Sequence, residues 1–157
     1  MFRPVRCLQG QDHDAVVEIY RQAVLGSTAA LYSAAQQQAW AEQCHTLRLQ
    51  LHQGEGFVVC DPHDQPQAFS LRHPSDRVAL LYCHPAAQRQ GCGQRLLEAI
   101  EQRSRAQAIA MLRTEASLIS KPLFERLGWQ VSWREELRIG GVNFKRFRMH
   151  KLLGQGY

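Results

Sequence analysis

CHPAAQRQGCGQRLLEAIE, residues 83–101, is the stretch that decides the fold, because it joins a buried strand to an amphipathic helix through a loop with two closely spaced glycines. Residues 78–83 form a nearly continuous apolar run, which predicts a central strand covered on both faces. The apolar residues of the helix recur at helical spacing and are Leu96, Leu97 and Ile100. Gly91 and Gly93 remove side chains where this helix begins, which indicates that a ligand approaches the backbone there.

The loop from Gln88 to Gly93 has the chemistry of an anion site. The first amides of a helix have no partner within it, and the helix dipole stabilises an anion at that end by roughly 0.3–1 kcal/mol. Arg89 adds positive charge at the rim. A Walker loop needs Gly-Lys-Ser/Thr, but Gly93 is followed by Gln94 and Arg95. A dinucleotide fingerprint needs a small residue at the position of Leu96. The GxG spacing alone leaves a plain strand-to-helix turn as the alternative.

The length and composition predict a single domain over residues 1–157. A chain of this size with 45% hydrophobic residues can bury one core, and no linker or repeat divides it. No apolar run is long enough to cross a bilayer, and the first residues lack the apolar centre of a secretory signal. We therefore expect a cytoplasmic protein that does not contact a membrane.

The charged residues and cysteines exclude some classes of ligand. The net charge of +5 is spread along the chain, so nucleic acid is a weaker expectation than a small phosphorylated ligand. The five cysteines form no CxxC pair, which predicts reduced thiols and no metal site.

Periodicity and turn residues predict the remaining elements. Strands are expected over residues 3–8, 57–60, 67–71, 110–115, 130–139 and 142–149, and helices over 14–24, 33–40 and 121–127. Ser33 and Gln36 match a capping box, Gly128 ends the last helix, and Gly140 with Gly141 suits a two-residue hairpin turn. The order of these elements predicts a mixed α/β fold with helices on the faces of a sheet.

The pattern Gln88-x-x-Gly91-x-Gly93 resembles the acetyl-CoA binding motif of the GNAT N-acetyltransferase superfamily. It follows an apolar strand that ends in Cys83-His84-Pro85, and it precedes a leucine-rich helix. LFERLGW, residues 123–129, resembles that family's "FYEKxGF" region. TEASLISKPLFERLGW and NFKRFRMHKLL are similar to a bacterial branch of acetyltransferases. The resemblance covers nearly the whole chain and implies a mixed, mostly antiparallel sheet whose strands splay apart at the cofactor cleft.

The resemblance also implies how acetyl-CoA is held and what the protein does. The backbone of Leu81, Tyr82 and Cys83 would pair with the pantetheine arm. The pyrophosphate would bind to the loop residues Gln88, Arg89, Gln90, Gly91, Cys92 and Gly93. Ser117 stands where the family often has an Asn that touches cofactor or substrate. An amine would attack the thioester directly, and no metal is needed.

The catalytic groups are less clear from the sequence. The family's tyrosine, the usual acid for the leaving thiolate and a cofactor contact, falls on Phe124, and Ser120 or water is the expected substitute. Glu115 is the first candidate for the base and His84 the second, although a polar strand end and an exposed loop residue are the alternatives. Cys92 at the helix start is interpreted as a packing residue, because no His-Asn or His-Asp pattern accompanies it.

The acceptor is an amine of a small molecule or a protein. Tyr32 and Trp40 are candidates for the acceptor wall, with a core role equally open for Trp40. A sensor or interaction module that binds acetyl-CoA without efficient catalysis is the competing function. The sequence leaves the oligomeric state open, with a homodimer among the options.

Overall fold

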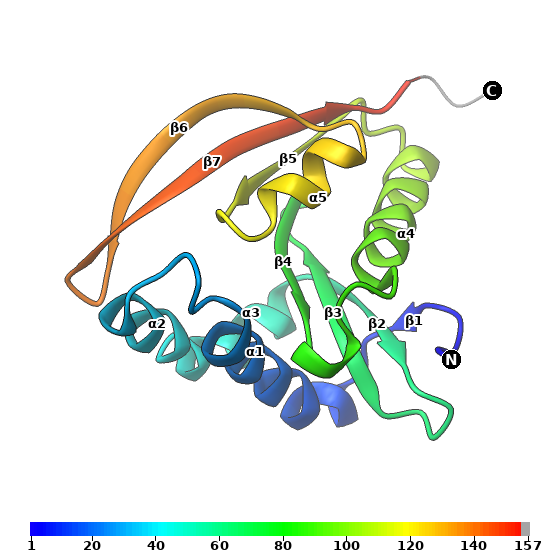
Figure 1. Ribbon diagram of the computed structural model, residues 1–157. Coiled ribbons are helices and arrows are strands. Elements are labelled where there is room, and N and C mark those ends of the chain that lie inside the picture. Colours follow the sequence, from blue (N-terminus) through cyan, green and yellow to red (C-terminus); the bar gives the residue numbers. More distant parts are fainter. Residues whose placement is uncertain (155–157) are drawn as a thin grey trace.

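The computed structural model of the protein describes residues 1–154, which form one seven-stranded sheet with helices on both faces (Figure 1). In chain order the strands and α-helices are β1 (Arg6–Cys7), α1 (His13–Ser27), α2 (Ala34–Ala41), α3 (Cys44–Gln53), β2 (Glu55–Cys60), β3 (Pro66–Arg72), β4 (Arg77–Cys83), α4 (Cys92–Ala106), β5 (Met111–Ala116), α5 (Lys121–Arg126), β6 (Gln130–Ile139) and β7 (Val142–Leu152). Short 3-10 turns η1 (Gly10–Asp12) and η2 (Pro85–Ala87) precede α1 and follow β4.

The sheet has the strand order β1-β2-β3-β4-β5-β7-β6. Every neighbouring pair is antiparallel except β4 and β5, which run parallel. The expected mixed, mostly antiparallel sheet is confirmed. The chain passes from β4 to β5 through α4, because two consecutive parallel strands need a crossover that a tight hairpin cannot provide.

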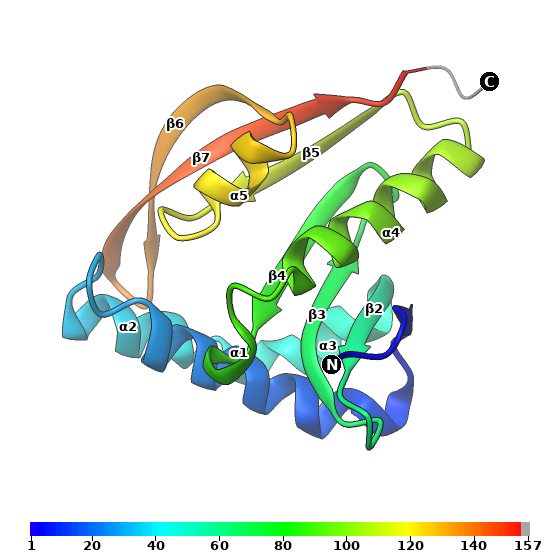
Figure 2. The same cartoon turned by 45° about the vertical axis from the view of Figure 1, so that its right-hand side comes forward.

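Two hydrophobic clusters cover the two faces of the central strands. On one face α4 packs on β2, β3 and β4, with Leu96, Leu97 and Ile100 fully buried as expected. On the other face α1 and α3 pack on the same strands. Figures 1 and 2 show α4 and the α1–α3 group on opposite sides of β2–β4. The strand at 78–83 therefore has helices packed on both faces, as its apolar run predicted, with Val78 buried and residues 79–83 half-buried.

The β6–β7 hairpin reaches back to the helical layer at the start of the chain. Gly140 and Gly141 both have positive φ, 55° and 78°, which a two-residue turn of this kind requires. Near this turn Phe144 is buried against Tyr32 and Ala39, and the Gln36 side chain donates to the Asn143 carbonyl over 2.9 Å. The hairpin tip and α2 thus lie side by side (Figure 1).

The sequence missed one helix and overextended one strand. α3 was not predicted from the sequence. Its buried residues are Leu47 and Leu51, and a single apolar pair at i, i+4 is too short a pattern to indicate a helix. Residues 3–8 form only the two-residue strand β1. The capping box at Ser33 is confirmed, since Ser33 and Gln36 exchange side-chain and backbone hydrogen bonds. Within residues 1–154, no helix is long and apolar enough to cross a membrane.

Candidate active site

β4 and β5 separate from each other a short distance after they meet. Their pairing is limited to Arg77 with Arg113 and Val78 with Thr114, and the Thr114 hydroxyl donates to the Val78 carbonyl over 2.8 Å. Beyond Val78, β4 continues along β3 up to Cys83, while β5 continues along β7. The sheet therefore splits between β4 and β5, as Figure 2 shows, and the predicted splay is confirmed.

Backbone groups of β4 face this split. The His84 N–H donates to the Gln67 carbonyl of β3 over 2.8 Å. Because hydrogen bonding in an antiparallel pair alternates from residue to residue, the backbone groups of Tyr82 also face β3, and those of Leu81 and Cys83 face the split. The splayed edge thus offers donors and acceptors at two of the three positions that were expected to hold the pantetheine arm.

Residues 88–94, which we call the cradle, turn the chain from β4 into α4. Within residues 1–154, the N–H groups of residues 89–94 make no hydrogen bond. Arg89 and Gly91 have positive φ, 60° and 82°, and Gly91 is the N-cap of α4. A Cβ at Gly91 would meet no atom within 4 Å, so open space lies in front of it. Free amides at a helix N-terminus beside open space suit a phosphate group.

Gly93 has a second role that the sequence did not reveal. A Cβ at this position would lie 2.7 Å from the Leu123 Cδ2 atom of α5. The absence of a side chain at Gly93 therefore lets α5 pack against the first turn of α4. The two glycines of the motif differ, because Gly91 permits a left-handed backbone and Gly93 permits close packing of two helices.

Polar side chains hold the cradle to its surroundings. The Gln88 amide donates to the Ser27 hydroxyl at the end of α1 over 2.5 Å, and the Gln90 amide donates to the Ala86 carbonyl over 3.3 Å. Arg89 is exposed at the rim. His84 Nδ1 accepts a hydrogen bond from the Ala86 N–H over 3.1 Å and so caps η2.

The thiols of Cys83 and Cys92 interact where β4 ends and α4 begins. The neighbouring Cys83 thiol lowers the pKa of Cys92, burial opposes this shift, and the Arg95 charge assists it. Cys92 and burial both raise the pKa of Cys83. Cys92 is buried beside the Ala87 carbonyl, 3.9 Å from its sulfur. This burial agrees with a packing role for the side chain, while its N–H belongs to the cradle.

Glu115 lies on the face of β5 that α4 does not cover, and arginines surround its carboxylate. Arg77 Nε donates to both oxygens, at 2.9 and 3.2 Å, and Arg148 Nη1 lies 3.6 Å from Oε1. Arg148 in turn pairs with Glu135 over 3.1 Å. This ladder of ion pairs ties β4, β5, β7 and β6 together at the closed end of the split.

Ser117 and Ser120 bind each other just after β5. The Ser117 N–H donates to the Ser120 hydroxyl over 3.0 Å, the Ser120 N–H donates to the Ser117 hydroxyl over 3.1 Å, and the two hydroxyls are 3.1 Å apart. This reciprocal pair shapes the loop that leads into α5. A direct role of either hydroxyl toward acetyl-CoA remains a prediction.

Phe124 is part of the core. Its side chain is only 2% exposed, and its ring meets Trp129 edge to face with centroids 4.9 Å apart. The ring packs in the cluster beneath α4 with Leu96 and Ala116. The structure therefore gives Phe124 a packing role, and a contact with cofactor remains a prediction.

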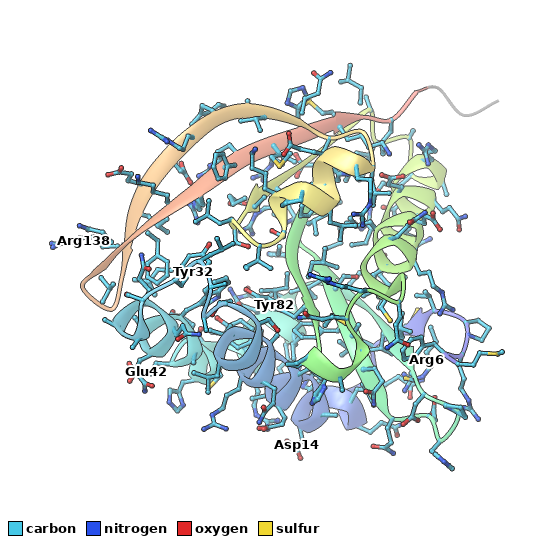
Figure 3. The ribbon with its side chains drawn as sticks, in the orientation of Figure 1. Arg6, Asp14, Tyr32, Glu42, Tyr82 and Arg138 are labelled. Carbon is cyan, nitrogen blue, oxygen red and sulfur yellow. The ribbon has the colours of Figure 1, made fainter. Side chains whose placement is uncertain are left out.

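Tyr32 lies on the α1–α2 side of the split (Figure 3), and Trp40 packs against it. Their ring centroids are 5.1 Å apart, and Trp40 Nε1 donates to the Tyr82 hydroxyl over 3.2 Å. The Tyr20 hydroxyl donates to the Trp40 carbonyl over 2.9 Å. Burial raises the pKa of Tyr82 to about 12. Tyr32 and Trp40 therefore share one aromatic cluster that reaches β4 through Tyr82.

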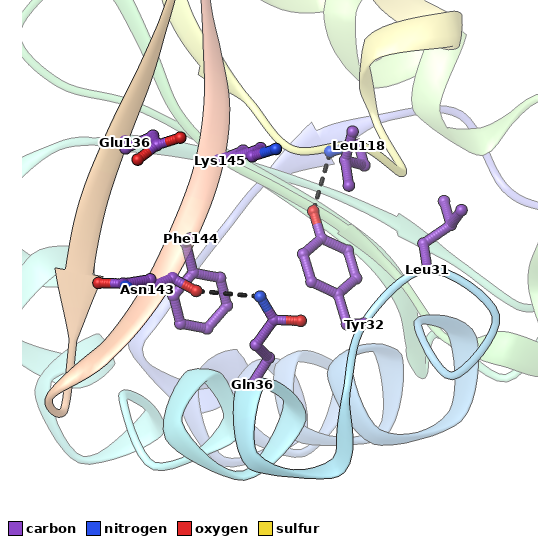
Figure 4. A pocket seen from close by; sticks show the side chains of 8 residues that line it. All are labelled: Leu31, Tyr32, Gln36, Leu118, Glu136, Asn143, Phe144 and Lys145. Carbon is purple, nitrogen blue, oxygen red and sulfur yellow. Dashed lines mark hydrogen bonds between the residues drawn. The ribbon is translucent and has the colours of Figure 1, made fainter.

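A pocket of about 400 Å³ opens beside Tyr32 (Figure 4), and we call it the acceptor pocket after the role proposed for it below. Its lining residues are Leu31, Tyr32, Gln36, Leu118, Glu136, Asn143, Phe144 and Lys145. The size falls in the range of small-molecule sites. Sequence reasoning named only Tyr32 of these as a site residue. Leu31 and Gln36 are its neighbours in the chain, and the other five come from the loop after β5 and from the β6–β7 hairpin. The one available signal was Phe144, an aromatic residue close to the Gly–Gly turn.

The side chains that commonly bind metals are scattered over the described residues. Within residues 1–154, no three His, Cys, Asp or Glu side chains are grouped so that they could hold a metal ion. The chemistry available at the split consists of backbone amides, hydroxyls, imidazole and carboxylate.

Comparisons with known proteins agree with this geometry. The sequence profile described as "Acetyltransferase (GNAT) domain" matches residues 19–151. A GCN5-related N-acetyltransferase structure from Rhodopseudomonas palustris superposes with a TM-score of 0.90 at 23% identity, covering 98% of each chain. A search of curated protein sequences gives no match.

Two further solved structures contain the cofactor. PaiA N-acetyltransferase from Thermoplasma acidophilum, in complex with coenzyme A, has a TM-score of 0.74 at 17% identity and covers 97% of this chain and 99% of its own. A phosphinothricin acetyltransferase from Sinorhizobium meliloti, in complex with acetyl-CoA, has a TM-score of 0.69 at 20% identity, with 97% and 89% covered. At these identities the likeness shows that the fold is the same.

Proposed function

The chain belongs to the GNAT acetyltransferase family, and we propose that it is an acetyl-CoA-dependent N-acetyltransferase acting on a primary amine of a small molecule or a protein. In enzyme-class terms it would be an acyltransferase that transfers groups other than aminoacyl groups. One observation carries the proposal: the N–H groups of residues 89–94 make no hydrogen bond within residues 1–154, and they lie at the mouth of the split between β4 and β5.

The proposal assigns each part of acetyl-CoA to residues of this chain. The cradle would bind the pyrophosphate through its amides, with Arg89 adding charge at the rim. Leu81 and Cys83 would pair with the pantetheine arm through their backbone groups. The backbone groups of Tyr82 face β3, so Tyr82 would instead contribute its ring to the wall on the acceptor side. Its hydroxyl accepts a hydrogen bond from Trp40 there.

Transfer would be direct. The acceptor amine enters from the acceptor pocket and attacks the thioester carbonyl, whose developing negative charge is stabilised by a backbone N–H near the end of β4. Tyr32 and Trp40 orient the acceptor as parts of the aromatic wall. The pocket volume favours a small amine over a folded protein, although a chain terminus could also enter.

Two residues remain candidates for the base that takes the proton from the amine. Both oxygens of Glu115 accept from Arg77, and the carboxylate keeps further lone pairs that could take a proton. His84 accepts the Ala86 N–H at Nδ1, so the hydrogen of its neutral ring is on Nε2 and the lone pair that could take a proton already caps η2. Glu115 therefore stays the first candidate and His84 the second.

A second candidate function is an acetyl-CoA-binding sensor with weak catalysis. The observation in its favour is Phe124, which has no hydroxyl and is buried in the core. Release of coenzyme A thiol in the presence of an amine separates the two functions, because a sensor binds acetyl-CoA without consuming it.

The test has two steps. Acetyl-CoA at a hundred times its dissociation constant should stabilise the folded protein by about 2.7 kcal/mol and raise its melting temperature, whereas NAD and ATP should do far less. Equal shifts with all three ligands would reduce the cradle to a general anion site. A thiol-release screen of amines, antibiotics and peptides would then identify the acceptor class, and binding without release from any of them would favour the sensor.

A further inference from the structure

We propose that the Tyr32 hydroxyl is the group that protonates the departing thiolate. This inference rests on the proposed function, since it names the acid for that reaction. The family's tyrosine position is occupied by Phe124, which has no hydroxyl and faces the core. A different residue must therefore supply the proton if the chain uses a protein acid.

The position of the Tyr32 oxygen supports this role. Tyr32 follows the loop after α1, far from β5 in the sequence, yet its hydroxyl lies 2.9 Å from the Leu118 N–H (Figure 4). Leu118 lies in the loop after β5, two residues beyond the end of this strand, and β5 borders the split. The hydroxyl thus sits where the acceptor pocket meets the end of β5.

The hydrogen bond at Tyr32 has the direction that an acid requires. The Leu118 N–H donates and the Tyr32 oxygen accepts, so the hydrogen of Tyr32 is left for donation. A hydrogen bond from a backbone amide would also stabilise the phenolate that remains after donation. Burial raises the pKa of Tyr32, and the hydrogen bond from the Leu118 backbone opposes this shift. The net direction keeps the phenol protonated at neutral pH.

The other hydroxyls in this region are engaged differently. Ser117 and Ser120 are bound to each other and to each other's backbone. The Tyr20 hydroxyl donates to the Trp40 carbonyl, and the Tyr82 hydroxyl accepts from the Trp40 ring. Tyr32 is the tyrosine of this cluster whose oxygen is held by the loop after β5.

The proton balance of the step is complete. The amine nitrogen forms a bond to the carbonyl carbon, the carbon–sulfur bond breaks, and its electron pair goes to sulfur. Tyr32 transfers its hydrogen to that sulfur, which gives the free thiol of coenzyme A. The proton that the amine loses as it becomes an amide passes to the base and solvent, and solvent returns one to the Tyr32 phenolate.

Tyr32→Phe is the first test, because it removes one oxygen and keeps the ring that packs on Trp40 and Phe144. Thiol release is measured with 2-phenylethylamine as a probe amine and, without amine, as hydrolysis of acetyl-CoA. We expect turnover to fall about a hundredfold or more while the acetyl-CoA dissociation constant, measured by calorimetry, stays within about twofold. Tyr20→Phe is the matched control, since it removes a bonded hydroxyl from the same cluster, and its turnover should be unchanged.

Fluorotyrosine at position 32 distinguishes a hydroxyl that acts as an acid from one that has only a structural role. Fluorine lowers the pKa of a phenol with almost no change in shape, and an acid acts only while protonated. The loss of activity at alkaline pH should therefore move to lower pH with each added fluorine, which a merely structural hydroxyl would not cause. The proposal is overturned by an unmoved alkaline limb, by a Tyr32→Phe turnover within a few fold of the parent, or by an equal loss in Tyr20→Phe. Failure of the parent protein to bind acetyl-CoA would instead overturn the proposed function.

Discussion

The cradle and the acceptor pocket are formed by different parts of the chain, the cradle by backbone and the pocket by side chains. The cradle uses the backbone of consecutive residues, 88–94, at the start of one helix. The acceptor pocket uses side chains from the α1–α2 loop, α2, the loop after β5 and the β6–β7 hairpin. A backbone site depends on local conformation, whereas a side-chain site depends on how distant segments meet. We therefore expect substitutions on the two sides to separate cofactor affinity from acceptor use.

The largest effect should follow Phe144→Ala on the acceptor side. Phe144 is 5% exposed and lies 6.2 Å from the ring centroids of both Tyr32 and Trp40. Loss of a buried aromatic ring should lower the free energy of unfolding by about 3–4 kcal/mol and raise the KM for the acceptor. Acetyl-CoA affinity should hold in calorimetry, with Phe144→Leu as the milder control. A large loss of acetyl-CoA affinity in a folded variant would show that the two sides are not independent.

Gly91→Val should have the next largest effect, and on the opposite side. The new side chain would occupy the open space of the cradle and would disfavour the φ of 82°. We expect acetyl-CoA affinity to fall about a hundredfold, or about 2.7 kcal/mol, as measured by calorimetry on protein whose circular dichroism is unchanged.

Gly91→Asn is the matched control for backbone strain, because Asn tolerates positive φ while still placing a side chain in the cradle. Equal losses in the two variants would mean that the cradle is blocked, and a loss in the Val variant alone would point to strain. Normal binding by both variants would remove the phosphate from this loop.

Phe124→Tyr tests the border between the two sides. Because the ring is in the core against Trp129, the added hydroxyl should lower the free energy of unfolding by about 1–3 kcal/mol without raising turnover. Melting temperature and thiol release are measured on the same samples. Higher turnover at unchanged stability would mean that position 124 reaches the thioester, and would argue against Tyr32 as the acid.

The smallest effect should come from Arg89→Ala. The exposed guanidinium at the rim of the cradle is screened by salt, so acetyl-CoA affinity should fall only about threefold, or about 0.6 kcal/mol. The difference from the parent should shrink at high ionic strength in calorimetric titrations. A loss that persists at high salt would indicate that Arg89 contacts a phosphate directly.

The sequence determined the parts of this protein that depend on local preferences. The apolar run of β4, the amphipathic face of α4, the capping box at Ser33 and the Gly140–Gly141 turn are each encoded within a few residues, and all are present in the structure. The same holds for the free amides of the cradle, because any helix start leaves its first N–H groups unbonded. These elements and the conformation of the cradle could therefore be predicted from adjacent residues.

Only the tertiary structure decided which side chains meet at the split. Glu115, the first candidate for the base, forms ion pairs with Arg77 of β4 and Arg148 of β7, and Phe124, a candidate cofactor contact, has its ring in the core. Tyr32 meets Leu118 across 86 positions of the chain. Such contacts leave no local pattern, since neither residue alone specifies its partner, and they form only when the sheet and its helices pack together.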